Sequence, residues 1–197
     1  MVERELKAVV EDPGALKARL VAAGAQVRFA GRMADRRFDR GGELAVRDEV
    51  LRIREYRGPD GLTRTTVSWK GPTTVEGDYK LRVEDEFEAA DAEAVTRVVM
   101  ALGYLPVHAI DREVEYYDLG GAIVRLEWYP RMDVLMEVEG PAEAIDHAVA
   151  TLGIARDQCR TDSLAAFVAR YEARTGHRAA VSLAELDDPA RDEAATS

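Results

Sequence analysis

The stretch Met1-Val2-Glu3-Arg4-Glu5-Leu6-Lys7-Ala8-Val9 opens the chain with a pattern that later segments repeat. Glu3, Glu5 and Lys7 are spaced two residues apart. On a β-strand their side chains would therefore point to one face, while apolar residues alternate on the other. For a single strand the simplest interpretation is a solvated outer face, so the remaining strands have to decide where these charges point.

Composition narrows the possible functions. The 197 residues are 47% apolar and 32% charged, which suits one sizeable domain. The net charge of −10 argues against nucleic acid or a membrane as partner, because both attract clustered positive charge. One cysteine, Cys159, excludes an intrachain disulfide and a cysteine-based zinc site. Without an apolar run of about 18 residues or a signal-like start, we expect a soluble, cytoplasmic protein.

Capping and turn residues divide the chain into helices and strands. Helices are expected from Asp12 to Gly24 and from Asp91 to Gly103, because each range begins with a capping aspartate and ends at glycine. Two more are expected over 141–153 and 161–174. Strands are expected over 2–9, 26–40, 50–56, 62–70, 79–89, 107–118, 122–128 and 134–139. This order indicates an α+β domain with a largely antiparallel sheet or barrel.

The end of the chain differs from the rest. Residues 177–197 hold five acids, two arginines and little apolar material. Such a composition is typical of a flexible appendix. We therefore predict a domain over 1–175 and an acidic, flexible tail over 176–197.

Five expected strands carry two or more charges on one face. These charges are Glu3/Glu5/Lys7, Arg52/Arg54, Lys80/Arg82/Glu84/Glu86, Arg125/Glu127 and Glu137/Glu139. The helices must cover the apolar face of the sheet, which leaves the charged face pointing inward or into a groove. Because burying an unpaired charge costs several kcal/mol, this interior must contain water, ions or a charged ligand.

The two signs of charge favour different ligands. Converging carboxylates suit Mg²⁺ or Mn²⁺, which prefer oxygen ligands. Interleaved arginine and lysine side chains suit phosphate or carboxylate. Together they predict a metal–polyphosphate complex better than either component alone.

The motifs carry a family resemblance. Glu3-x-Glu5-x-Lys7 resembles the ExExK signature of the CYTH superfamily, the triphosphate tunnel metalloenzymes, which include class IV adenylate cyclases, thiamine triphosphatases and inorganic triphosphatases. Further segments follow in the family's order: Phe38-Asp39, Leu51-Arg52-Ile53-Arg54, Lys70-Gly71-Pro72, Arg82-x-Glu84-x-Glu86, Arg112 and Glu137-Val138-Glu139. The resemblance spans residues 2–170 and implies an antiparallel eight-stranded β tunnel with flanking helices.

The resemblance also implies roles for the charged residues. Mg²⁺ or Mn²⁺ would be held by Glu3, Glu5, Glu84, Glu86, Glu127, Glu137 and Glu139. A triphosphate would be bound by Lys7, Arg52, Arg54, Lys70, Arg82, Arg112 and Arg125. The catalytic residues would be Lys7, Arg54 and Lys80. A homodimer is expected from the family analogy alone.

Four positions are set apart from this pattern. Ile110 stands where the family often has a lysine, two residues before Arg112, and in some triphosphatases that lysine is thought to position the attacking water. The sequence therefore leaves open how efficiently the protein would hydrolyse a triphosphate. Lys80 is expected to take the place of the missing lysine. The three arginines 36, 37 and 40 are expected to be solvated or to lie at the rim rather than to bind a ligand.

The sequence leaves three functions open. The preferred one is a metal-dependent triphosphatase acting on inorganic triphosphate or on an organic one such as thiamine triphosphate or a nucleotide. A class IV type adenylate cyclase shares the triphosphate clamp, but there the ribose 3′-hydroxyl attacks the α-phosphate. The third is a non-catalytic polyphosphate- or nucleotide-binding module, which the isoleucine at position 110 would favour.

Overall fold

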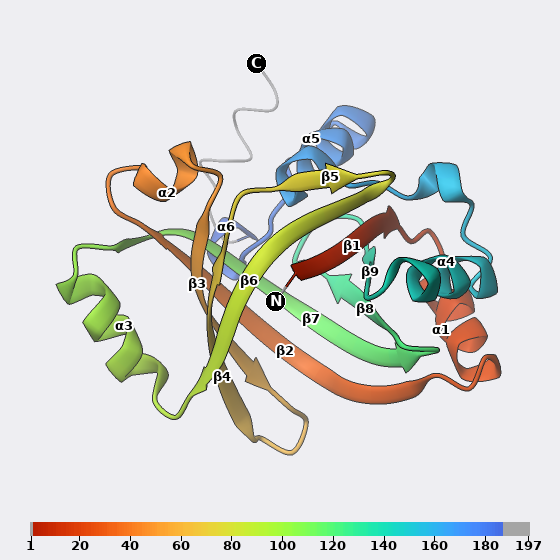
Figure 1. Cartoon of the computed structure of the whole chain (residues 1–197), viewed down its shortest axis with the longest axis horizontal. Helices are drawn as coiled ribbons and strands as arrows, with labels where there is room; N and C mark the ends of the chain where they lie inside the picture. Colours follow the sequence, from red (N-terminus) through yellow and green to blue (C-terminus); the bar gives the residue numbers. More distant parts are fainter. Residues whose placement is uncertain (1, 187–197) are drawn as a thin grey trace.

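A closed barrel of eight antiparallel strands dominates the computed structural model, which describes residues 2–186 (Figure 1). The strands follow one another around the barrel in the order β1-β9-β8-β7-β2-β3-β4-β6, and β6 pairs with β1 to close it. This confirms the predicted α+β tunnel. The strands are β1 (Val2–Val9), β2 (Gln26–Asp39), β3 (Val50–Arg57), β4 (Thr63–Lys70), β5 (Thr74–Glu76), β6 (Tyr79–Ala89), β7 (Leu105–Leu119), β8 (Ala122–Trp128) and β9 (Leu135–Glu139).

The helices lie outside the barrel (Figure 1). They are α1 (Pro13–Ala22), α2 (Glu43–Val46), α3 (Ala92–Ala101), α4 (Ala142–Thr151), the 3-10 helix η1 (Arg156–Gln158), α5 (Leu164–Thr175) and α6 (Leu183–Leu186). Asp12 and Asp91 cap α1 and α3 as predicted, each accepting a backbone N–H at 2.9 Å. Neither α2 nor β5, an extra strand on the edge of β6, was predicted from the sequence. None of the described helices is long and apolar enough to cross a membrane.

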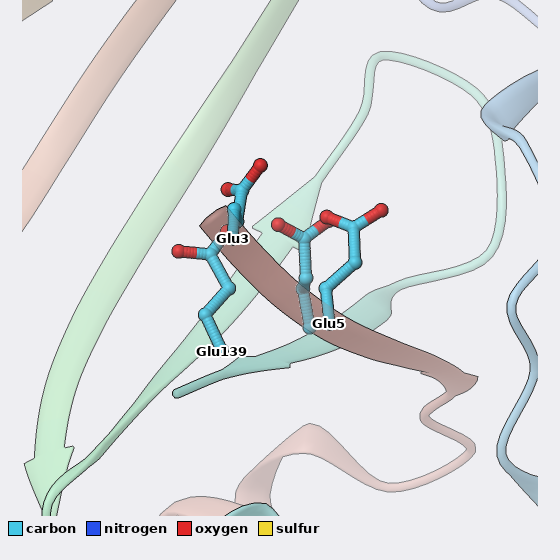
Figure 2. A group of neighbouring side chains, drawn as sticks. Glu3, Glu5 and Glu139 are labelled. Atoms are coloured by element: carbon cyan, nitrogen blue, oxygen red, sulfur yellow. The ribbon is translucent and has the colours of Figure 1, made fainter. Parts of the chain in front are cut away.

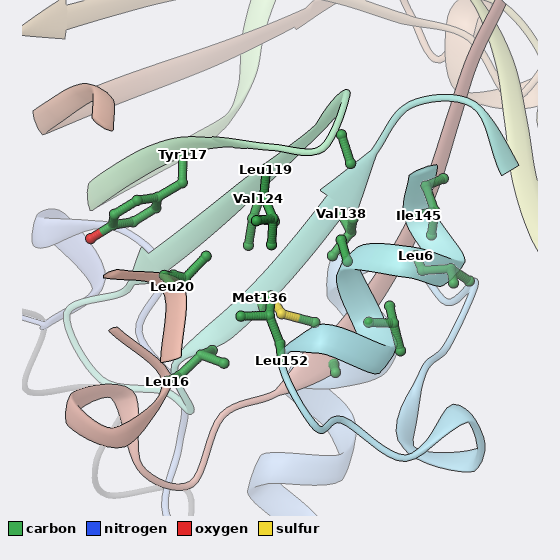
Figure 3. Packing of buried hydrophobic residues seen from close by; sticks show 14 of the residues in the cluster. Leu6, Leu16, Leu20, Tyr117, Leu119, Val124, Met136, Val138, Ile145 and Leu152 are labelled. Atoms are coloured by element: carbon green, nitrogen blue, oxygen red, sulfur yellow. The ribbon is translucent and has the colours of Figure 1, made fainter. Parts of the chain in front are cut away.

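The main apolar core lies between helices α1 and α4 and the outer face of β1, β8 and β9 (Figure 3). Leu16 and Leu20 of α1 and Ile145 of α4 are fully buried there against Leu6 and Met136 from the strands. Burying one such side chain stabilises the fold by about 1.5–3 kcal/mol. Because strand residues alternate between faces, this packing turns the intervening charged residues toward the barrel interior.

The helices do not cover the whole barrel. On the outer face of β6, Val83 and Phe87 are 48% and 61% exposed. The expectation that helices cover the apolar face of the sheet is therefore right for β1, β8 and β9 and wrong for β6. It is closure of the barrel, not helix cover alone, that turns the charged face inward.

The first part of the predicted flexible tail is docked. Ala180 is fully buried and exchanges two backbone hydrogen bonds with Arg131, at 3.0 and 2.8 Å. The carbonyl of Val181 accepts the N–H of Asp111 at 2.8 Å. These bonds tie residues 177–186 to β7 and to the loop after β8. The remaining residues of the predicted tail, 187–197, lie outside the described part of the chain.

Candidate functional site

Four carboxylates from β1 and β9 meet inside the barrel and form the acid quartet: Glu3, Glu5, Glu137 and Glu139. One oxygen of each lies within 4.8 Å of one from every other. Glu5 pairs directly with Glu139 across the two antiparallel strands, and residues two apart share a face. Figure 2 shows the carboxylates of Glu3, Glu5 and Glu139 gathered on one side of these strands.

Two lysines form ion pairs with members of the acid quartet. Lys7 Nζ lies 2.8 Å from Glu5 and also contacts Glu137. Lys80 Nζ lies 2.6 Å from Glu5. Burial alone would lower the pKa of Lys7, but Glu137 and Glu5 hold it above the ordinary lysine value. Both catalytic lysines predicted from the sequence therefore lie at the acid quartet, and Lys7 is positively charged there.

Arg125 of β8 is the central cation of the site. It contacts Glu137, and its guanidinium lies 2.7 Å from Glu127 and 3.4 Å from Glu139. It is almost fully buried, and one of its N–H groups donates to the Tyr116 hydroxyl at 3.3 Å. A buried charge is stable only when opposite charges and hydrogen bonds surround it, and this arginine has both.

Two members of the acid quartet, Glu137 and Glu139, have pKa values that are shifted in opposite directions. Burial raises the pKa of Glu139 well above the ordinary value; Arg125 opposes this shift, while the neighbouring carboxylates Glu137 and Glu3 add to it. Burial acts on Glu137 in the same direction, but Arg125 and Lys7 hold its pKa well below the usual range. Glu139 is therefore the carboxyl group that holds a proton more readily than Glu137 does. Four carboxylates with oxygen donors alone are a set that suits Mg²⁺ or Mn²⁺.

A cavity of about 110 Å³, here called the tunnel cavity, adjoins the acid quartet and includes Glu5 and Glu137 in its wall. Nine lysine and arginine side chains line it: Lys7, Arg37, Arg52, Arg54, Lys70, Lys80, Arg82, Arg112 and Arg125. All seven residues predicted to bind triphosphate, which come from six different strands, are in this set. A larger hollow of about 410 Å³ shares Arg112 with it, but its three arginines are matched by three acids.

Asp35 is a site residue that the sequence analysis missed. It is fully buried in β2, with Arg54 at 3.3 Å and Arg112 at 3.5 Å. Burial would raise the pKa of Asp35, but Arg54, Arg52 and other nearby guanidiniums hold it below the ordinary value. The aspartate therefore stays ionised and fixes two of the predicted phosphate-binding arginines.

Three of the seven acids predicted to bind metal lie outside the acid quartet. Glu127 is buried against Arg112 at 3.2 Å and Arg125. Glu84 lies 2.8 Å from Arg52 and 3.1 Å from Lys70. Burial opposes ionisation of Glu84, but these two cations lower its pKa to about 2. Both acids are thus paired with the cations of the cavity wall.

Glu86 is exposed to solvent, contrary to its predicted place among the metal ligands. Among the described residues, the pairing of β1 with β6 ends at Val2 opposite Val83, so Glu86 has β4 on one side, at Ser68, and no β1 residue on the other. Lys70 and Glu3 are in contact just inside that limit. The alternation of β6 placed Glu86 on the correct face, but beyond the closed part of the tunnel.

The three arginines expected at the rim differ from one another. Arg36 is part-exposed and donates to Asp111 at 2.7 Å, and Arg40 is exposed beside Glu43. Arg37 is instead part-buried and lines the tunnel cavity. The reason is the strand period: positions 35 and 37 share the inner face and 36 the outer one.

Ile110 is buried in an apolar cluster with Tyr129, Leu135 and Phe167 of α5. The position where the resemblance would place a lysine is therefore packed against α5. Lys80 lies at the acid quartet on the other side of the barrel. A role for Lys80 in place of that lysine stays a prediction.

No protein-family model matches the sequence, and no curated protein sequence matches it significantly. Solved structures do match. A Vibrio parahaemolyticus protein, provisionally named an adenylate cyclase, has a TM-score of 0.73 at 16% identity, covering 86% of this chain and 98% of its own. PH1012 from Pyrococcus horikoshii has a TM-score of 0.68 at 17% identity, covering 84% and 98%.

A third structure adds a reported activity. HpAC1 from Hippeastrum, provisionally named an adenylyl cyclase and described as having a dominant triphosphatase activity, has a TM-score of 0.60 at 16% identity. It covers 84% of this chain and 93% of its own. The chain shares the barrel fold of these three structures. The barrel fold that the resemblance of seven short motifs implied is thus confirmed by structures of low sequence identity, whose activities are their own.

Proposed function

We propose that the CYTH-like tunnel is the active site of a divalent-metal-dependent triphosphatase. One observation carries the proposal: the acid quartet adjoins a small cavity lined by nine cations, and Glu5 and Glu137 belong both to the quartet and to the cavity wall. Acids alone would suit a metal, and cations alone would suit any anion. A metal–polyphosphate complex satisfies both groups.

In this proposal the acidic and the basic residues have different roles. The acid quartet would hold Mg²⁺ or Mn²⁺, which when bound neutralises phosphate charge and orients the attacking group. Arg52, Arg54 and Arg112 would bind the phosphate oxygens, and Asp35 holds two of these guanidiniums in place. Such preorganised donors stabilise the charge that develops on the transferring phosphoryl group.

The size of the tunnel cavity favours a phosphate chain over a complete nucleotide. Its volume of about 110 Å³ is well below the 300–1,000 Å³ that is typical of pockets for drug-sized ligands. Inorganic triphosphate, or the triphosphate of a ligand whose head group stays outside, fits this limit. The second candidate is an adenylate cyclase, favoured by the provisional name of the Vibrio parahaemolyticus neighbour.

An assay of the purified protein with inorganic triphosphate, thiamine triphosphate and ATP, each with Mg²⁺ or Mn²⁺, tests the proposal. Release of orthophosphate is the expected result. Cyclic AMP together with pyrophosphate would replace the proposal by the cyclase. Binding without turnover of any of the three would leave a non-catalytic binding module.

Metal binding is expected to release a proton. The pKa of Glu139 is raised, mainly by burial, so in the metal-free protein this carboxyl keeps its proton above the ordinary glutamate range. A bound cation displaces that proton, so the affinity for Mg²⁺ or Mn²⁺ should rise with pH until Glu139 is ionised. Calorimetric titration in buffers of different ionisation enthalpy measures the proton directly. An equal heat in all buffers and an affinity independent of pH would contradict this assignment.

A further inference from the structure

Helix α5 begins at the wall of the tunnel cavity. Ser163, its N-cap, and Leu164, its first residue, both line the cavity. The Ser163 side chain accepts the Ala166 N–H, which leaves the earlier amides of the helix without an intrahelical acceptor. The end of a 12-residue helix that carries these amides is positively polarised and attracts anions.

Arg37 lines the same cavity and lacks a full set of partners. Its Nε is buried and has no hydrogen-bond partner among the described residues. Across the β2–β3 pairing Arg37 lies directly opposite Arg52, and like charges in that position destabilise a sheet. Burial lowers the pKa of Arg37; Asp35 opposes this, while Arg52, Arg112 and Arg54 add to it. In the protein alone, this charge is poorly compensated.

Asp35 does not remove the excess of positive charge. It is already shared between Arg54 and Arg112, and a single carboxylate cannot balance the guanidiniums around it. The acids of the quartet are engaged by Lys7, Lys80 and Arg125. The cations around Arg37 therefore lack an anion to balance them.

We infer that Arg37 and the N-terminal amides of α5 form a phosphate subsite at one end of the tunnel cavity. The ligand class is a tetrahedral oxyanion, and, resting on the proposed function, it is a phosphoryl group of the bound triphosphate. Arg37 would donate charge-assisted hydrogen bonds to its oxygens, and the backbone N–H groups of residues 164 and 165 would donate from the helix end. The subsite adds a phosphate contact to the arginines already named.

The first test compares Arg37→Gln with Arg36→Gln, its neighbour on the outer face. Binding of inorganic triphosphate is measured by calorimetry in EDTA, and the thermal midpoint of the ligand-free protein is measured in parallel. Arg37→Gln should weaken binding about 10- to 100-fold, as expected for hydrogen bonds to a charged group. Its ligand-free midpoint should stay equal or rise, because a poorly compensated buried charge is removed. Arg36→Gln should bind within about 2-fold of wild type, since that side chain points away from the cavity.

The same measurement separates the subsite from the proposed function. Arg37-dependent binding in a protein that hydrolyses none of the three triphosphates would keep the subsite and end the triphosphatase proposal. Hydrolysis by wild type together with unchanged binding by Arg37→Gln would support the triphosphatase proposal and overturn the subsite. A loss of affinity matched by a lower ligand-free midpoint would overturn the subsite too, because Arg37 would then be structural.

The helix contribution has its own pair of variants. Leu164→Pro removes the N–H at the first helical position, where proline is well accommodated, and Leu164→Ala removes the side chain but keeps the N–H. Leu164→Pro should bind inorganic triphosphate about 10-fold more weakly than Leu164→Ala. Equal affinities would overturn the part of the subsite assigned to α5 and leave Arg37 alone.

Discussion

Glu5→Gln is expected to lower metal-dependent phosphate release by roughly 10²–10³-fold, the scale seen when one preorganised charged or polar group is removed from an active site. Glu5 belongs to the acid quartet and contacts Lys7 at 2.8 Å and Lys80 at 2.6 Å. Burial and Glu137 raise its pKa, but Lys7, Lys80 and Lys70 outweigh them, so Glu5 is ionised. Glutamine keeps the size and removes the charge that both the metal and the lysines require.

Glu86→Gln is the matched control for this prediction. The substitution is chemically identical, but Glu86 is exposed and lies beyond the closed part of the tunnel. Initial rates of phosphate release at saturating Mg²⁺ or Mn²⁺, with circular dichroism to check folding, compare the two variants. Full activity in Glu5→Gln, or equal losses in both variants, would show that the acid quartet is not the metal site.

The alternation of charge along the strands predicted the inner face of the barrel well. Glu5 and Glu137 are 132 positions apart in sequence, yet each was assigned to the inside from its neighbours two residues away. Strand period determines the face of a residue, and closure of the barrel then brings the inner faces together. For this reason all seven predicted triphosphate-binding residues line one cavity.

Position along the tunnel was not predictable in the same way. Glu84 and Glu86 share a face in sequence, but in the structure the first is part-buried beside Arg52 and the second is exposed. The difference depends on where β1 begins and on its register with β6, which is a long-range pairing. The alternation of side chains along a strand, which repeats every two residues, carries no information about that register.

Arg37 shows a second limit of the sequence. It stands between Arg36 and Phe38 in a basic stretch, and such a run is most often a solvated face. The strand period alone would have placed Arg36 and Arg37 on opposite faces, because they are adjacent. Recognising that Arg37 lines the tunnel cavity needed the position of Asp35 on the inner face, and an isolated aspartate carries no such signal.

Arg125→Met is expected to destabilise the metal-free protein by about 3–5 kcal/mol, the cost of breaking a buried ion pair by removing one partner. Arg125 is almost fully buried and contacts Glu127, Glu137 and Glu139. Methionine fills much of the space but leaves three carboxylates without their shared cation. Urea unfolding in EDTA measures the loss as a lower midpoint at unchanged slope.

The loss should grow with pH, and this dependence distinguishes lost charge from lost packing. In the wild type, Arg125 and Lys7 outweigh burial and hold the pKa of Glu137 below its unfolded value, so its contribution is present above about pH 4.5 and fades only in stronger acid. Without Arg125, Glu137 and Glu139 favour protonation in the folded state, which therefore loses stability as pH rises. The difference between variant and wild type should be larger at pH 8 than at pH 5. Arg97→Met on α3, whose exposed partner Glu93 lies at 3.7 Å, is the control and should cost about 0.5 kcal/mol or less at either pH. A loss in Arg125→Met that is independent of pH would mean that packing, not the charge of this arginine, stabilises the acidic wall of the tunnel.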